Sequence, residues 1–213
     1  DMHFARTRLL ALENTIGGRV LGADYMAQAT SLAHARGLAT HLDGARICNA
    51  AVKQGISLRD ATAGFDTVSV CLSKGLGAPV GSVLLGPKAF IEQGKRWRKM
   101  LGGGMRQAGI LAAAGIIALE EMTERLHEDH ANARALADGL CGTRAFEVDL
   151  PRVRTNMFFC TMSPDAPIGP AELTTRLRAD GILVWHRGNM FRFVTHYWVK
   201  AQHVEQVMGR ITH

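Results

Sequence analysis

The stretches His41-Leu-Asp-Gly-Ala-Arg46 and Cys71-Leu-Ser-Lys-Gly-Leu-Gly-Ala-Pro-Val80 decide the fold of this chain. Each begins as an apolar run of strand type and continues into a polar loop that contains glycine. In open α/β sheets, ligands bind outside the carboxyl ends of the strands, where such loops gather. The sequence therefore predicts that Asp43 and Lys74 lie at one rim of a sheet.

Predicted strands and helices alternate around these two stretches. Short apolar runs predict strands at 7–13, 39–43, 66–72 and a buried one at 81–86, and helical spacing predicts helices at 24–36, 47–52 and 87–101. Asp24 is expected to cap the first of these helices and Gly37 to end it. Such alternation is typical of an α/β domain with a mostly parallel sheet that is covered on both faces.

The second half of the chain predicts a smaller unit. One long helix over 107–140, apolar at its start and polar from Glu120, is expected to pass from core to surface and to join two domains. Beyond it, the pattern predicts strands near 156–162, 182–187 and 190–195, and helices near 170–180 and from 200 onwards. We therefore expect an α/β domain at 1–125 and a small α+β domain at 126–213.

Composition excludes several classes of protein. With 213 residues and 47% apolar content, the chain can bury a substantial core. Its net charge of +6 is spread along the sequence, and the densest basic group, at 95–99, is expected to be an exposed helix face. No nucleic acid partner is therefore predicted. No apolar run approaches the roughly 20 residues that a membrane span needs, so we expect no membrane association and a cytoplasmic location.

The cysteines and histidines do not form a metal-binding pattern. Cys48, Cys71, Cys141 and Cys160 are widely spaced and lack a C-x-x-C motif, so we expect buried free thiols in a reducing compartment. The segment His127-Glu-Asp-His130 lacks metalloprotease spacing and is expected to lie on a solvated helix face. No metal site is predicted.

The predicted proximity of Asp43 and Lys74 indicates a particular chemistry. Taken alone, a lysine after a strand is usually a solvated loop residue, and an aspartate before glycine usually forms a turn. Taken together, they supply what pyridoxal phosphate requires. The amine forms a Schiff base with the aldehyde, and the carboxylate pairs with the pyridinium nitrogen and keeps the ring an electron sink.

Two other functional motifs are not present. Gly75, Gly77 and Gly81 form G-x-G-x-x-x-G, which is one residue too long for the dinucleotide-binding fingerprint and precedes a strand instead of a helix. The chain contains no G-x-S-x-G motif, so an α/β-hydrolase mechanism is not predicted.

Further motifs occur in a set order along nearly the whole chain. They are Leu12-Glu-Asn-Thr15, His41-Leu-Asp-Gly-Ala-Arg46, Cys71-Leu-Ser-Lys-Gly75 with Ala78-Pro-Val-Gly81, Arg96-Trp-Arg-Lys-Met100 with Gly102-Gly-Gly-Met-Arg-Gln107, and Val194-Thr-His196. In these residues the chain resembles the L-threonine aldolases, the low-specificity and L-allo types, within the fold type I pyridoxal phosphate enzymes. The Gly-Gly-Gly-Met-Arg-Gln segment is highly specific.

The resemblance implies a fold and a set of cofactor contacts. Residues 1–125 would be the C-terminal part of a large cofactor-binding domain with a mostly parallel sheet. Lys74 would be the Schiff-base lysine and Asp43 the partner of the pyridine nitrogen. Ala45 would pack its methyl group against the ring, and Arg46 would contact the cofactor or the polar edge of the substrate.

Two further arginines are implicated by the same resemblance. Arg106, in a glycine-rich turn, would bind the cofactor phosphate, and in the family this arginine serves the site of the neighbouring subunit. Arg192 would bind the substrate carboxylate in a bidentate manner. Its apolar neighbours in the strand make an unpaired charge at this position costly.

The resemblance implies a carbon–carbon lyase that depends on pyridoxal phosphate. It would cleave L-threonine, L-allo-threonine or a related β-hydroxy-α-amino acid to glycine and an aldehyde, as a homodimer or homotetramer with shared active sites. Two alternatives stay open. One is β-elimination or transamination with the same cofactor, and the other is a non-catalytic fragment of the fold.

The chain departs from the family pattern in two ways. Ile16 stands where the family often has a histidine near the substrate hydroxyl, so we expect a more apolar pocket that favours bulky or aromatic substrates over threonine. The family also has roughly a hundred more residues at the amino terminus. We therefore expect that this segment alone binds cofactor weakly or is incomplete for activity, since sheet edges and an apolar face would lie uncovered.

Overall fold

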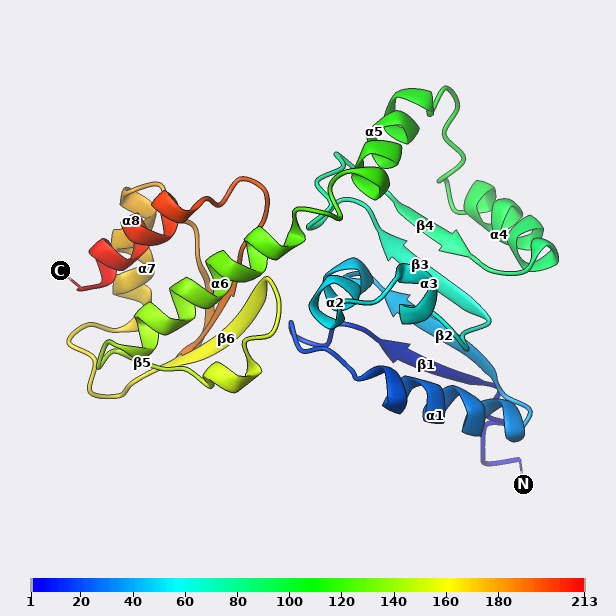
Figure 1. The fold of residues 1–213 in the computed structure, drawn as a ribbon, viewed down its shortest axis with the longest axis horizontal. Helices are drawn as coiled ribbons and strands as arrows, with labels where there is room; N and C mark the ends of the chain where they lie inside the picture. Colours follow the sequence, from blue (N-terminus) through cyan, green and yellow to red (C-terminus); the bar gives the residue numbers. More distant parts are fainter. Residues whose placement is uncertain (1, 213) are drawn as a thin grey trace. The chain divides into compact units, whose positions relative to one another are not determined.

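A computed structural model describes residues 2–212, which form two compact units (Figure 1). The first unit comprises the residues up to Ile16 and Leu21–Thr123. The second comprises Gly17–Val20 and the residues from Glu124 onwards. The chain thus passes from the first unit to the second, returns, and crosses for the last time after Thr123.

The first unit contains a four-stranded sheet in the order β1-β2-β3-β4 (Figure 1). Its strands are β1 (Leu9–Glu13), β2 (Ala39–Gly44), β3 (Thr67–Cys71) and β4 (Ser82–Leu85). The first three are parallel, and β4 is antiparallel to β3. The prediction of a mostly parallel sheet is confirmed. Because β1, β2 and β3 run in the same direction, their carboxyl ends meet at one rim.

Among its described residues, this unit contains five helices: α1 (Ala23–Ala35), α2 (Ile47–Gln54), α3 (Leu58–Ala61), α4 (Lys88–Met100) and α5 (Gly109–Glu120). α1 packs against β1 and β2. Its N-cap is Gly22, and Asp24 lies inside the first turn without capping it, so that detail of the prediction was wrong. Gly37 adopts a φ of +67°, a left-handed conformation that suits the residue following a helix.

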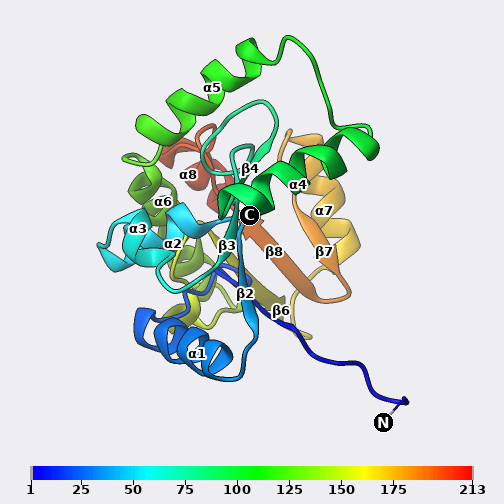
Figure 2. The ribbon, with the colours of Figure 1, turned by 90° about the vertical axis from the view of Figure 1, so that its right-hand side faces the viewer.

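Much of the apolar surface of this unit is exposed. β4 was predicted to be buried, but Leu84 and Leu85 are exposed because β4 is an edge strand in the described structure. α4 buries none of its residues, as expected for its basic face. α5 is apolar throughout, yet only Gly115 and Ala118 are buried. Figures 1 and 2 show α4 and α5 as separate helices joined by a segment that is neither helix nor strand.

The predicted single helix over 107–140 is two helices, α5 and α6 (Leu126–Cys141). At the end of α5 the amide of Met122 bonds to the carbonyl oxygen of Ile117, a wider spacing than the helical i to i−4 pattern. The residues that follow form turns up to Arg125, the N-cap of α6. The boundary between the two units falls in this interruption.

The second unit is an antiparallel sheet covered by helices on one face. The strands, in the order β5-β6-β8-β7, are β5 (Phe146–Glu147), β6 (Met157–Met162), β8 (Met190–Val194) and β7 (Trp185–Arg187). The helices are α6, α7 (Pro170–Ala179) and α8 (Ala201–Thr212), and a short 3-10 turn, Leu150–Arg152, precedes β6. Side chains of alternate residues in β6 and β8, among them Phe158, Phe191 and Phe193, form the core with α6, α7 and α8.

Further findings concern membrane helices, metal ligands and the thiols. Among the described residues, no helix is long and apolar enough to cross a membrane, and no cluster of His, Cys, Asp and Glu side chains could hold a metal ion. All four cysteines are free, as predicted. Cys48 and Cys160 are buried, and burial raises their pKa values to about 11 and about 12. Cys141 is exposed, which corrects the expectation of buried thiols.

Candidate active site

Asp43 and Lys74 come from the carboxyl ends of two adjacent parallel strands. Asp43 is the fifth residue of β2 and pairs in register with Ser69 of β3. Lys74 follows the end of β3 by three residues. Both side chains belong to exposed residues at the rim of the sheet. The structure thus places the acid and the amine at neighbouring strand ends, where open α/β sheets bind ligands.

The loop after β2 is shaped by Asp43 and Gly44. One carboxylate oxygen of Asp43 accepts a hydrogen bond from the amide of Ala45 at 3.0 Å, which leaves the second oxygen available to a ligand. A Cβ atom at Gly44 would lie 2.7 Å from the carbonyl oxygen of Ser69, so only glycine lets the two strands approach this closely. Ala45 and Arg46 follow, both half-buried, and Arg46 is the N-cap of α2.

The Lys74 loop is held by backbone hydrogen bonds. The amide of Gly77 donates to the carbonyl oxygen of Lys74 at 2.9 Å, and the amide of Ala78 donates to that of Leu72 at 3.0 Å. The amide of Leu72 in turn donates to Gly81 at 3.0 Å. These bonds return the chain directly into β4 and fix the backbone that carries Lys74.

Cys71, at the end of β3, lies in the same loop region. Partial burial opposes ionisation of its thiol, but hydrogen bonds with Ser73 and Ser82 and the charge of Lys74 outweigh that effect and lower the pKa of Cys71. The Sγ atom of Cys71 lies 3.5 Å from the hydroxyl oxygen of Ser73. The pKa of the Cys71 thiol therefore lies below that of an ordinary cysteine.

Thr15 adds a polar group at the same rim. The amide of Asn14 donates to the carbonyl oxygen of Asp43 at 3.1 Å, which ties the residues after β1 to the end of β2. The next residue, Thr15, is 1% exposed, and its hydroxyl has no hydrogen-bond partner among the described residues. A buried unpaired hydroxyl is costly unless a ligand or water satisfies it. The sequence motif contained Thr15, but this signal required the structure.

Arg106 lies away from secondary structure. It is exposed in the segment between α4 and α5, next to Gly104 and Met105. Its guanidinium group carries five N–H donors and belongs to an exposed residue, so an anion can reach it. The structure does not bring Arg106 into a hydrogen-bonded network with Asp43 or Lys74.

Arg192 lies in the second unit, in the middle of β8. Its neighbours Phe191 and Phe193 point into the helix-covered core, so alternation along the strand places Arg192 on the opposite face of the sheet. Arg192 is half-buried, and its Nε atom donates a hydrogen bond to the sulfur of Met157 at 3.1 Å. A charged group is thereby held on the face that the helices leave open.

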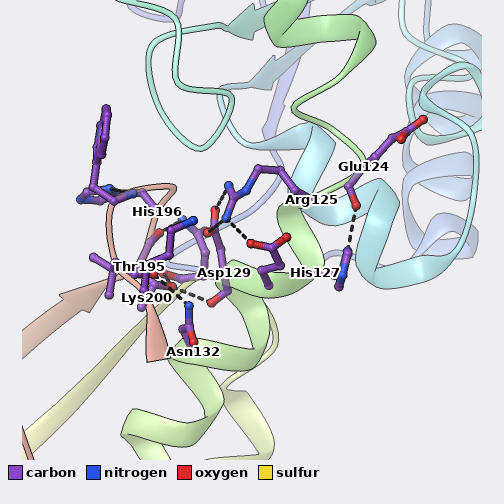
Figure 3. Close-up of polar contacts among 12 residues, drawn as sticks. Glu124, Arg125, His127, Asp129, Asn132, Thr195, His196 and Lys200 are labelled. Atoms are coloured by element: carbon purple, nitrogen blue, oxygen red, sulfur yellow. Dashed lines mark hydrogen bonds and ion pairs between the residues drawn. The ribbon is translucent and has the colours of Figure 1, made fainter. Parts of the chain in front are cut away.

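A second polar cluster stabilises the end of β8 (Figure 3). Asp129 of α6 is fully buried and forms an ion pair with Arg125, with the closest N–O distance at 2.6 Å. The hydroxyl of Thr195 donates to the carbonyl oxygen of Asp129 at 2.6 Å. Arg125 also lies over the ring of Tyr197, 5.1 Å from its centroid, with Lys200 at 4.4 Å.

This cluster corrects the expectation for 127–130. His127 and Glu128 are exposed as predicted, but Asp129 is buried between α6 and the segment after β8. Burial alone would lower the pKa of Arg125, and the hydrogen bond and charge of Asp129 outweigh it, so the pKa of Arg125 is raised. The pair lies at the start of α6, and the contacts of Arg125 with Tyr197 and of the Asp129 carbonyl oxygen with Thr195 hold α6 against the residues that follow Arg192.

Comparison with known proteins agrees with this arrangement. A family model described as beta-eliminating lyase matches residues 1–163. The low specificity L-threonine aldolase of Escherichia coli K12 is 45% identical over 207 residues, which cover 97% of this chain and 60% of that protein. The chain thus spans about 60% of the length of this curated relative.

Solved structures show the fold. The threonine aldolase of Leishmania major superimposes with a TM-score of 0.77 at 16% identity, over 100% of this chain and 62% of that one. A structure of SPT with PLP gives a TM-score of 0.68 at 18% identity, over 96% and 54%. The fold is that of fold type I pyridoxal phosphate enzymes, as predicted. Given the family model that matches most of its length, the chain belongs to the beta-eliminating lyase family.

Proposed function

We propose that this chain provides the larger part of an aldolase that uses pyridoxal phosphate to cleave β-hydroxy-α-amino acids, such as L-threonine or L-allo-threonine, to glycine and an aldehyde. One observation carries the proposal. Asp43 and Lys74 lie at the carboxyl ends of adjacent parallel strands in a chain that is 45% identical to a low specificity L-threonine aldolase.

The residues at this rim fit the cofactor. Lys74 offers a primary amine for covalent attachment, and Asp43 keeps one carboxylate oxygen for the ring nitrogen. Gly44 has no side chain that would push the strands apart. The hydroxyl of Thr15 is buried and unpaired beside them. When bound, pyridoxal phosphate supplies a ring that accepts the electrons of the breaking Cα–Cβ bond.

Each residue would then have a distinct task. Lys74 holds the cofactor, and Asp43 keeps the ring nitrogen protonated through its negative charge. Ala45 packs its methyl group against the ring, and Arg46 contacts the cofactor or the polar edge of the substrate. Arg106 binds the phosphate in the site of a neighbouring subunit, which would make the protein a homodimer or homotetramer with shared sites.

Arg192 would bind the substrate carboxylate. A planar guanidinium group that binds a carboxylate through two parallel hydrogen bonds fixes the orientation of the amino acid. That orientation decides which bond of the α-carbon overlaps the ring's π system and is therefore broken. In this scheme the first unit is the C-terminal part of the cofactor-binding domain, and the second is the small domain that carries Arg192.

Product analysis tests the proposal. The protein at its natural length, loaded with pyridoxal phosphate and given L-threonine or L-phenylserine, should release glycine and the matching aldehyde in equal amounts. The Lys74→Ala variant should release neither. Release of ammonia and a keto acid instead would support β-elimination, which is the second candidate because the matching family model is that of beta-eliminating lyases.

A further inference from the structure

The side chain of Arg192 is held by an unusual partner. Its Nε–H group donates to the thioether sulfur of Met157, 35 residues earlier in the chain, at 3.1 Å. Met157 pairs in register with Val194, two residues from Arg192, so the two side chains are diagonal neighbours on one face of the sheet. This is the face opposite the helices, which also carries Phe159 directly across from Arg192.

Met157 is fixed from several sides. It is 4% exposed, although it lies on the face that α6, α7 and α8 do not cover. Gly18 lies against it so closely that a Cβ atom at that position would be 2.0 Å from the carbonyl oxygen of Met157. The hydroxyl of Thr155 donates to the carbonyl oxygen of Gly18 at 2.6 Å and holds the Gly17–Val20 segment in place. The backbone of Met157 is therefore closely packed, and its side chain is shielded from solvent.

Asn156, the residue before Met157, fixes the pairing of β6 with the end of β8. The side-chain amide of Asn156 donates to the carbonyl oxygen of Thr195 at 2.8 Å, and the amide of Thr195 donates to that of Asn156 at 2.9 Å. Both residues are 1% exposed. These bonds set the register between β6 and β8 immediately beside Met157, and this register makes Met157 and Arg192 diagonal neighbours.

We propose that Met157 is a positioning residue that presents the outer edge of Arg192 to the substrate carboxylate. The inference rests on the proposed function. A guanidinium group offers five N–H donors in a fixed plane, and the bond to Met157 uses the Nε–H donor and sets the tilt of that plane. The two Nη groups are not used by this bond and could form a bidentate bond with a carboxylate.

A sulfur acceptor suits this task better than the alternatives. A carboxylate at position 157 would form an ion pair with Arg192 and compete with the substrate for its charge. A hydrocarbon side chain would leave the Nε–H group unpaired in a half-buried position and the plane free to rotate. A thioether is a weak acceptor without charge, so it orients the guanidinium group without neutralising it.

The test compares three variants of the protein loaded with pyridoxal phosphate. Met157→Leu, which keeps the volume and removes the acceptor, should raise KM for the amino acid about three- to tenfold and leave kcat within about twofold, the range expected for the loss of one hydrogen bond to a weak acceptor. Met162→Leu, a buried methionine of the same strand that does not contact Arg192, is the matched control and should leave KM unchanged. Met157→Gln, which restores a neutral acceptor of similar length, should recover most of the loss.

A second readout does not depend on turnover. In protein labelled with nitrogen-15 in arginine, the Nε–H signal of Arg192 is assigned as the one that disappears in Arg192→Lys. Its proton should exchange with solvent faster in Met157→Leu than in the wild type. If Met157→Leu alters neither KM nor this exchange while Arg192→Lys raises KM strongly, the positioning role is refuted and the role of Arg192 stands. If Arg192→Lys itself leaves KM unchanged, the proposed carboxylate site is wrong, and the role of Met157 falls with it.

Discussion

Asp129 and Arg125 form a buried ion pair in which the carboxylate accepts hydrogen bonds from both Nη atoms, at 2.6 and 3.3 Å. The Asp129 side chain is 0% exposed and that of Arg125 is 13% exposed. Removing one partner of such a pair leaves an uncompensated charge away from water. The pair is therefore a point where a single substitution should have a large effect on stability.

We predict that Asp129→Ala lowers the free energy of unfolding by about 3–5 kcal/mol. Glu128→Ala is the matched control, because Glu128 binds the same arginine at 3.3 Å but is 47% exposed, and it should cost no more than about 1 kcal/mol. Urea unfolding followed by circular dichroism measures both values. Equal losses for the two variants would show that burial of Asp129 does not matter.

Gly18 should be intolerant of any side chain. It has a φ of +82°, and a Cβ atom would overlap the carbonyl oxygen of Met157. We expect Gly18→Ala to destabilise the protein by at least about 3 kcal/mol, since a backbone shift must accompany it. Gly37→Ala has a similar φ of +67° with open space around it, so backbone strain alone should cost about 1 kcal/mol. Thermal unfolding of the two variants separates steric overlap from strain.

Asp66 should make stability depend on pH. Its carboxylate accepts from the amide of Thr40 at 2.7 Å and lies 3.2 Å from Nε2 of His34, and the first of these bonds contributes most to lowering the pKa of Asp66 below 3.8. A lowered pKa in the folded state gives stability that is present above the unfolded pKa and is lost as the pH falls through the folded value.

The variant Asp66→Asn should therefore be less stable than the wild type at pH 7, by no more than about 1 kcal/mol because the carboxylate is half-exposed and screened by solvent. The difference should shrink below pH 3.8 as the wild-type carboxylate takes up its proton. Unfolding curves at several pH values follow this change. A difference that stays constant down to the lowest pH would rule out the linkage.

Ile16 should influence substrate choice. It follows Thr15 at the rim of the first sheet and is 43% exposed. An apolar side chain near the substrate hydroxyl favours apolar substituents, so we expect a higher kcat/KM for phenylserine than for threonine. The variant Ile16→His should reduce that ratio by restoring a hydrogen-bond partner. Comparable kcat/KM values for the two substrates in the wild-type protein would reject this prediction.

The rim of the first sheet could be predicted because its signals are local. Each of the strands before Asp43 and Lys74 is a short apolar run that ends in a polar loop with glycine, and parallel strands align their carboxyl ends. The break between α5 and α6 at Met122 could not be predicted because the helical spacing of apolar residues continues across it. The wider hydrogen bond to Ile117 that ends α5 leaves no mark in the sequence pattern.

Contacts between distant residues could not be predicted. The spacing of Arg125 and Asp129 suggests a helical ion pair, but the hydrogen bond from Thr195 to the carbonyl oxygen of Asp129 joins residues 66 positions apart. The bond between Arg192 and Met157 likewise depends on the register of β6 with β8. The unpaired hydroxyl of Thr15 became evident only once its surroundings were known.

The most direct test of the central claim is a titration with pyridoxal phosphate, followed by the long-wavelength absorbance of the bound cofactor, on the protein at its natural length. Wild-type protein should reach saturation at one cofactor per chain. Lys74→Ala should lose the band, and Asp43→Asn should weaken binding and shift the band. An unchanged band in Lys74→Ala would show that the cofactor is held elsewhere and would contradict the account.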